Sequence, residues 1–328
     1  MIIESPLDLI FRDLFYRLRR FVGDHDVFLK LEGFNVTGSI KIKTAMGLVE
    51  DLERRGIAMP HQTVIVESSS GNLGIALSLV CAMKGYRFIC VTDPNANRAN
   101  VRGMELYGAQ VVIVEDHDDA GGYLGSRLKK IDQILQLEPN AIWLNQYANT
   151  ANKNVHADQT ANEIAREFSK VDWVFVGTGT TGTLAGISER LHHEFPSIKM
   201  VAVEPVGSVT FGGAPAKRHI PGIGTSVRPT LADYANPDRV VRISEERTVE
   251  ACLSFVRDHH LLVGGSTGTV LAAVRELASE FAPGDTIVAI SADLGDKYLD
   301  TVYDPAWVEN VIVPRGKRTV RSYPVAAE

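Results

Sequence analysis

The sequence predicts an α/β fold with two lobes, each a mostly parallel sheet with helices on both faces. Three observations support this prediction. Strand-like and helix-like runs alternate along almost the whole chain. The strand-like runs are apolar, which is typical of parallel strands buried on both faces. The chain has 328 residues, a length that suits two domains or lobes.

The expected elements follow one another in a regular order. In the first half we expect strands at 27–31, 63–66, 88–92, 110–114 and 141–144, and helices at 41–54, 72–84, 98–107 and 124–137. In the second half we expect helices at 156–168, 181–194, 246–259 and 267–281, and strands at 173–176, 200–203, 240–243 and 286–290. Ser39 is the candidate N-cap of the helix that begins at residue 41.

Composition and charge argue against several functions. The formal net charge is -6, which disfavours a nucleic-acid partner. Arg12, Arg17, Arg19 and Arg20 are interrupted by apolar residues, so we interpret them as the exposed face of an N-terminal helix. No apolar run is long enough to cross a bilayer, and no signal region follows the start, so we expect a cytoplasmic protein without a membrane partner. The three cysteines are scattered, and no metal site is expected.

The most informative stretch is residues 67–74, with the sequence ESSSGNLG. A β-branched run precedes it and an apolar, helix-like run follows it. A strand that ends in small hydroxyl residues and glycine before a helix makes a socket for an anion, because free N–H groups and the helix dipole point at one place. The same residues would also suit an ordinary turn with a serine cap. Two more loops and one lysine decide in favour of a binding site.

The second loop, residues 177–182, has the sequence GTGTTG between an expected strand and helix. It matches Gly-x-Gly-x-x-Gly, and Glu204 at the end of the next strand stands where a ribose-binding acid would. A nicotinamide dinucleotide site is therefore a competing interpretation. The mid-chain position and the three threonines favour a single phosphate instead. The third loop, residues 264–268 (GGSTG), opens another helix, and its alternative interpretation is a tight turn with an N-cap.

Lys41 follows a strand and a small-residue turn and stands between Ile40 and Ile42. A lysine among apolar neighbours at a helix start can be desolvated, which lowers its pKa and makes the amine a nucleophile or Schiff-base partner. Lys43 is the obvious competitor. Together the sequence offers a lysine for an aldehyde, a Gly/Thr loop for a phosphate, a serine for a ring nitrogen and a Ser/Asn loop for a carboxylate. That set of groups suits pyridoxal phosphate.

The order of these motifs resembles the cysteine synthase family, the fold type II pyridoxal phosphate enzymes. The matching segments are 27–43 (lysine segment), 69–74 (asparagine loop), 145–149 (the segment with a substrate-binding Gln), 177–182 (phosphate loop), 221–224 (Gly-Ile-Gly loop) and 264–268 (Ser-Gly segment). The resemblance extends from about residue 27 to 305. It implies a tryptophan synthase β-like fold, a homodimer and small amino acid substrates. It also implies β-replacement through an aminoacrylate.

The resemblance implies a role for each matching residue. Lys41 would bind the cofactor aldehyde and, once released, remove the substrate α-proton. Asn72 would hydrogen-bond the ring hydroxyl, and Ser266 would face the pyridine nitrogen. The phosphate would be bound by Gly177, Thr178, Gly179, Thr180 and Thr181. The substrate site would include Ser69, Ser70, Gly71, Asn72, Gln146 and Gly224, with Ser69, Ser70 and Gln146 on the carboxylate.

The resemblance also implies a division into lobes. Residues 1–41 and 146–328 would form the larger lobe, which anchors the cofactor. Residues 42–145 would form the smaller, mobile lobe, which carries the asparagine loop.

Finer details resemble the branch of the family that replaces the phosphate of O-phospho-L-serine with L-glutamate, on the way to 2,3-diaminopropionate, a siderophore or antibiotic precursor. The shared segments are 67–76, 121–124, 145–149, 264–268 and 295–300. Because the phosphate of phosphoserine carries about two negative charges, its site should offer cationic donors, and Arg127 and Arg218 are the candidates.

The sequence departs from the family pattern at Val36, Thr37, Ile42 and Lys43, so the second substrate stays open. One alternative is a cysteine synthase-type enzyme that uses O-acetylserine or phosphoserine with sulfide or another nucleophile. More remote alternatives are an NAD-binding oxidoreductase and an inactive relative that only binds a ligand or partner.

Overall fold

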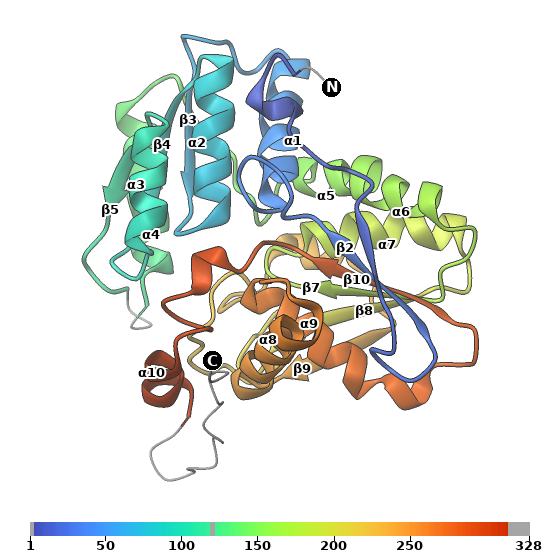
Figure 1. The fold of residues 1–328 in the computed structure, drawn as a ribbon. Helices are drawn as coiled ribbons and strands as arrows, with labels where there is room; N and C mark the ends of the chain where they lie inside the picture. Colours follow the sequence, from blue (N-terminus) through green and yellow to red (C-terminus); the bar gives the residue numbers. More distant parts are fainter. Residues whose placement is uncertain (1–2, 119–121, 314–328) are drawn as a thin grey trace.

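The computed structural model describes residues 3–118 and 122–313 and contains two sheets (Figure 1). The smaller has the order β5-β4-β3-β6, with strands β3 (Val64–Ser68), β4 (Arg87–Thr92), β5 (Gln110–Ile113) and β6 (Ala141–Trp143). The larger has the order β1-β2-β10-β7-β8-β9, with strands β1 (Phe15–Leu18), β2 (Asp26–Leu31), β7 (Trp173–Gly177), β8 (Lys199–Pro205), β9 (Arg239–Ile243) and β10 (Thr286–Ser291). Of the strand pairs within the described ranges, all are parallel except β1 with β2.

Helices cover both faces of each sheet. Around the smaller sheet lie α1 (Lys41–Arg54), α2 (Asn72–Lys84), α3 (Arg98–Leu106) and α4 (Leu124–Leu137). Around the larger lie α5 (Ala151–Val155), α6 (Asn162–Glu167), α7 (Gly182–Glu194), α8 (Glu245–His259) and α9 (Gly265–Glu276), with the short α10 (Pro305–Trp307) near the end. Apolar residues of α1–α3 pack on one face of the smaller sheet and those of α4 on the other. In the larger sheet α8 and α9 cover one face and α6 and α7 the other, so the predicted fold class is confirmed.

Shorter helical segments connect these elements: η1 (Pro6–Asp8), η2 (His156–Ala161), η3 (Thr230–Asp233), η4 (Ala278–Glu280), η5 (Asp296–Tyr298) and η6 (Val308–Ile312). None of the helices in the described ranges is both long and apolar enough to span a bilayer.

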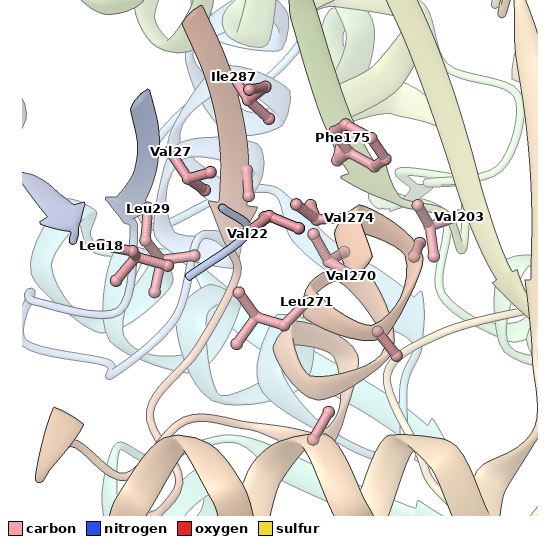
Figure 2. Packing of buried hydrophobic residues seen from close by; sticks show 14 of the residues in the cluster. Leu18, Val22, Val27, Leu29, Phe175, Val203, Val270, Leu271, Val274 and Ile287 are labelled. Atoms are coloured by element: carbon pink, nitrogen blue, oxygen red, sulfur yellow. The ribbon is translucent and has the colours of Figure 1, made fainter. Parts of the chain in front are cut away.

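The core of the larger sheet is formed by strand side chains that face α9. Figure 2 shows Phe175, Val203 and Ile287 from three strands directed toward Val270 and Val274 of α9. All five side chains are buried. Removing this apolar surface from water stabilises the packing of α9 on the sheet, and that packing sets where the first turn of α9 lies.

The predicted N-terminal helix is wrong. Residues Phe15–Leu18 form a strand that pairs antiparallel with β2, with Leu18 opposite Val27. Leu18 is buried, while Arg17 stays exposed and pairs with Asp26. The long-range pairing gives the segment hydrogen bonds and a half-buried face, which a local sequence pattern does not reveal.

The helix expected at 156–168 begins earlier and is interrupted. It extends from Ala151 to Glu167, and its middle third, His156–Ala161, is a π-helix. Helix α7 packs against this segment at Gly186, where a Cβ atom would lie 2.3 Å from the Lys153 carbonyl oxygen. π-Helical segments inside α-helices frequently occur at functional sites.

The strands of each sheet fall within the sequence range of one predicted lobe. Strands of the smaller sheet lie between residues 64 and 143, and strands of the larger sheet lie outside that range. The lobe boundaries at 41/42 and 145/146 stay a prediction.

Candidate active site

One cavity lies at the carboxyl end of β7, where α1, α7 and α9 begin. Its lining consists of Ile40, Lys41, Val176, Gly177, Gly179, Thr180, Thr181, Thr183, Gly222, Ser266, Val270, Ile290 and Ala292. The structure therefore brings together three segments that the sequence analysis singled out: the lysine, the phosphate loop and Ser266. Carboxyl ends of parallel strands are where α/β proteins bind ligands.

Lys41 and Lys43 lie two residues apart in different environments. Lys41 is the first residue of α1, and burial lowers the pKa of its amine to about 8, although nearby Glu67 opposes this shift. Lys43 is fully buried and contacts Glu32 at 2.9 Å and Glu163 at 2.6 Å. Lys30 contacts the same two carboxylates. Lys43 is thus held in a buried group of four charges, and Lys41 is the lysine that faces the cavity.

Ser39 does not cap α1. The N-cap position is occupied by Ile40, and no side-chain capping bond is formed there. The Ser39 hydroxyl is buried without a hydrogen-bond partner among the described residues.

In the phosphate loop, Thr181 immediately precedes α7 and has a backbone φ angle of 67°. A left-handed conformation is rare for a β-branched residue, and such strain clusters at ligand sites. The Thr181 hydroxyl donates to the Thr180 carbonyl at 2.6 Å. The Thr178 hydroxyl donates to Val203, away from the cavity, so among the threonines of this loop Thr180 and Thr181 line it.

A buried polar network supports this loop from behind. Asn152 donates to the Thr180 hydroxyl at 3.1 Å and to the Gln146 carbonyl at 2.8 Å. His156 contacts the hydroxyls of Thr44 and Thr183 at 3.1 and 3.2 Å. Burial lowers the pKa of His156 well below its usual value, and Lys43 and Lys41 lower it further, so the ring is neutral. The network joins α1, η2 and α7 without placing a charge beneath the loop.

The asparagine loop contacts the chain that follows β10 of the larger sheet, through the side chain of Asn72. Its Nδ2 donates to Asp293 Oδ2 at 2.8 Å, and its Oδ1 accepts from Lys297 Nζ at 2.9 Å. Asp293 also accepts from Ser266 at 3.5 Å and, through a shorter bond, from Tyr298. Two residues predicted to face the cofactor ring, Asn72 and Ser266, therefore share one partner.

The Ser69 hydroxyl already has partners within the loop. Its Oγ accepts from the backbone N–H groups of Gly71 at 3.3 Å and Gly74 at 3.0 Å. Ser70 is only half-buried. Ser69 thus shapes the start of α2, whereas Ser70 is the more accessible hydroxyl.

Glu67 joins Gln146 to the start of the asparagine loop. The Gln146 side chain donates to the Ser68 carbonyl at 3.0 Å, and its backbone N–H donates to Glu67 at 3.0 Å. Glu67 also accepts from the Ser68 N–H at 2.7 Å and from Trp143. Burial raises the pKa of Glu67 to about 7, although these donors oppose the shift.

Arg127 and Arg218 both have guanidinium nitrogens that are buried and unpaired. Arg127 lies 3.3 Å from Asp93 through Nη1, but its Nε has no hydrogen-bond partner among the described residues. Arg218 donates to Ser226 at 2.8 Å, while its Nε and Nη1 lack partners within the same ranges. Burial raises the pKa of Tyr147, and the two arginines oppose that shift. The Tyr147 hydroxyl is therefore within electrostatic range of both.

Gly224 has a φ of 75° and donates from its N–H to the Thr178 carbonyl at 2.6 Å. A Cβ atom there would lie 2.5 Å from Arg218 Nη1, so glycine lets the guanidinium approach the backbone. Gly121, in the resembling segment 121–124, lies outside the described residues.

Sequence reasoning missed Asp293 and Asn152. Tyr147, Lys297 and Tyr298 were noted only as parts of resembling segments. Asp293 is 2% exposed, and a charged residue that follows an apolar strand was the one available signal. Asn152 gave no local signal, because its partners Thr44 and Thr180 are distant in sequence.

The residues of the cavity fit pyridoxal phosphate. The amine with a lowered pKa suits the cofactor aldehyde. The N-terminus of α7, with glycines and two threonines of the preceding loop lining the cavity, suits a phosphate. Glu204, the residue that would have supported a dinucleotide, is fully buried and contacts Arg242 at 2.9 Å.

Comparisons with known proteins agree with this fit. Residues 11–293 match the Pyridoxal-phosphate dependent enzyme family. The crystal structure of an O-ureido-L-serine synthase is 29% identical, with a TM-score of 0.84, and the match covers 94% of this chain and 100% of that one. An O-acetylserine dependent cystathionine beta-synthase from Helicobacter pylori is 27% identical, with a TM-score of 0.84 and coverage of 92% and 98%. A hydrogen sulfide-producing enzyme from Fusobacterium nucleatum is 30% identical, with a TM-score of 0.84 and coverage of 91% and 100%.

The chain belongs to the Pyridoxal-phosphate dependent enzyme family. It is a pyridoxal phosphate-dependent enzyme of the β-replacement type, which makes β-substituted alanines. The predicted cofactor is confirmed, and the dinucleotide interpretation is wrong.

Proposed function

We propose that the enzyme replaces the phosphate of O-phospho-L-serine with the amino group of L-glutamate. The products are N-(2-amino-2-carboxyethyl)-L-glutamate and phosphate, as in N-(2-amino-2-carboxyethyl)-L-glutamate synthase. The observation that supports this proposal is the pair Arg127 and Arg218, which have buried guanidinium nitrogens without partners among the described residues and which both lower the pKa of Tyr147. Buried donors without partners are costly, and a phosphate that leaves with about two negative charges would satisfy them.

In the proposed reaction the chain's own residues bind, orient and move protons. The loop at 69–72 and Gln146 bind the α-carboxylate of phosphoserine. Lys41, with a pKa of about 8, is close enough to neutrality to take the proton from Cα and later return it. Bound pyridoxal phosphate supplies the electron sink for that deprotonation. The Cβ–O bond breaks, phosphate leaves with the electron pair near Arg127 and Arg218, and the glutamate nitrogen bonds to Cβ and loses a proton.

A second candidate function is a cysteine synthase-type reaction with O-acetylserine and sulfide or another nucleophile. The similarity to an O-acetylserine dependent cystathionine beta-synthase and to a hydrogen sulfide-producing enzyme favours it. An acetate leaving group needs no pair of guanidinium groups, so the two functions differ in their dependence on Arg127 and Arg218.

Mass spectrometry of products separates the two. The purified enzyme is offered phosphoserine or O-acetylserine, each with glutamate or sulfide. We expect the glutamate adduct from phosphoserine, and we expect Arg127→Ala and Arg218→Ala to lower kcat/KM for phosphoserine by about tenfold or more. Arg228→Ala is the control, because Arg228 lies close to Arg218 in sequence but is exposed and pairs with Asp233. If O-acetylserine is preferred and neither Arg127→Ala nor Arg218→Ala alters the ranking, the phosphoserine assignment fails.

A further inference from the structure

We propose that Asp293 and Lys297 are positioning residues that orient the Asn72 amide toward the cofactor ring. The inference rests on the proposed contact of Asn72 with that ring. It concerns the segment 292–298, which follows β10 and includes η5, and which reaches the N-terminus of α2 (Figure 1).

This segment contacts the lysine loop, the loop that opens α9 and the asparagine loop. Its backbone pairs with the lysine loop, where Ile40 N–H donates to the Ala292 carbonyl at 2.7 Å and Leu294 N–H to the Gly38 carbonyl at 3.3 Å. Gly264, just before Ser266, donates to the Asp293 carbonyl at 3.1 Å. Asn72 of the asparagine loop is bound by the side chains of Asp293 and Lys297. Segment 292–298 therefore couples Lys41, Ser266 and Asn72.

Charge determines which way the Asn72 amide points. Its oxygen accepts from the Lys297 ammonium group and its nitrogen donates to the Asp293 carboxylate. Rotating the amide by 180° would place N–H against the ammonium group and oxygen against the carboxylate, and both contacts would be repulsive. The amide is thereby held in one orientation, with its nitrogen on the side of Asp293 and its oxygen on the side of Lys297.

The two charged residues are themselves fixed. Lys297 also donates to the Thr37 carbonyl at 2.8 Å. Asp293 is 2% exposed, and a Cβ atom on Gly264 would lie only 1.9 Å from its Oδ1. Its carboxylate accepts from Asn72, Tyr298 and Ser266. Groups with this many fixed contacts can hold a neighbour in place, whereas an exposed pair could not.

Besides its effect on Asn72, Asp293 also acts on Ser266. In the structure the Ser266 hydroxyl donates to Asp293 at 3.5 Å, a long bond that is readily exchanged. A pyridine nitrogen that accepts a hydrogen bond would compete for that hydroxyl proton. Asp293 therefore holds the Ser266 hydroxyl near the expected ring site through a bond that the ring nitrogen can replace.

The test compares cofactor binding by apoprotein variants. We measure the dissociation constant of pyridoxal phosphate and the position of its visible absorption band for Asp293→Asn, Lys297→Met, Asn72→Ala and the corresponding double variants. We expect each single change to weaken binding by about tenfold and to shift the band. Added to Asn72→Ala, Lys297→Met should cost little more, because Lys297 acts through Asn72. Lys297→Arg should restore most of the affinity lost in Lys297→Met.

Asp300→Asn is the matched control, because Asp300 is exposed and lies just beyond the segment 292–298. Circular dichroism shows whether Asp293→Asn folds. If it does not, the test uses Lys297→Met and its double variant with Asn72→Ala. A loss in Lys297→Met that adds in full to the loss in Asn72→Ala, or an unshifted band, would overturn the positioning role alone. A wild-type affinity for Asn72→Ala would instead refute the ring contact, and the positioning role with it, but would leave the phosphoserine reaction standing.

Discussion

At the scale of single residues, the environment rather than the residue type distinguishes Lys41 from Lys43. Lys43 is surrounded by Glu32 and Glu163, which it shares with Lys30. Lys41 lies at the cavity and has no such carboxylate pair among the described residues. A desolvated amine is a better nucleophile near neutral pH than one that is paired with carboxylates.

The first prediction concerns the pH at which apoprotein captures its cofactor. Burial lowers the pKa of Lys41 to about 8 from 10.5, so the neutral amine predominates above about pH 8. We expect the rate at which the visible band appears to rise with pH to a midpoint near 8, measured by rapid mixing and corrected with free lysine in the same buffers. Borohydride reduction and peptide mapping should then place the pyridoxyl group on Lys41. A label on Lys43, or a midpoint near 10, would contradict this assignment.

The second prediction concerns the buried charge group. Lys43→Met removes one partner and leaves Glu32 and Glu163 with less compensation, so we expect a loss of about 3–5 kcal/mol of stability. The measurement is the urea concentration at half-unfolding. Arg166→Met is the control, since Arg166 and Asp13 form an exposed pair of a kind worth under about 1 kcal/mol. Equal effects of the two substitutions would mean that the buried group does not stabilise the fold as inferred.

At the scale of elements, two adjacent serines precede α2 and differ in their contacts. The Ser69 hydroxyl accepts from two backbone N–H groups of its own loop, as a capping side chain does. Ser70, one residue on, is more exposed. Two adjacent serines in one motif therefore have separable roles.

The third prediction follows from that separation. Ser70→Ala should retain the cofactor band but weaken amino acid binding, because it removes a hydroxyl from the predicted carboxylate site. Ser69→Ala should in addition lower stability by about 1 kcal/mol. Titration with phosphoserine, followed through the cofactor spectrum, gives the binding constants, and thermal melting gives the stability. If Ser70→Ala binds phosphoserine like the wild type, its hydroxyl does not contact the carboxylate.

At the scale of the whole molecule, the cavity is lined by elements of the larger sheet and by the start of α1, which packs on the smaller sheet. The asparagine loop is attached to the smaller sheet, while the phosphate loop and Ser266 belong to elements of the larger one. Asn72 links the two through Asp293 and Lys297. A substrate carboxylate bound at the asparagine loop would pull the smaller lobe toward the cofactor and exclude water from the reacting carbon.

The fourth prediction is a closure that depends on substrate. X-ray scattering of the cofactor-loaded enzyme should give a smaller radius of gyration with phosphoserine than without it. Ser70→Ala should close less and release more pyruvate and ammonia, the products of water entering. Inorganic phosphate at the same concentration is the control for ionic effects. The same scattering curve in both states, with no pyruvate from the variant, would show that this loop does not drive closure.

The sequence by itself determined the alternation of strands and helices, the three loops and the candidate lysine, because these depend on residues that are close together in the chain. Most helix ends were predicted to within a few residues for the same reason. The tertiary structure alone decided that Phe15–Leu18 is a strand, that His156 begins a π-helix and that Lys43 pairs with the buried carboxylates of Glu32 and Glu163. It also decided that Asp293 and Lys297 contact Asn72. Each of these outcomes depends on a partner far away in sequence, and the energy of such a contact exists only once the two sheets have packed.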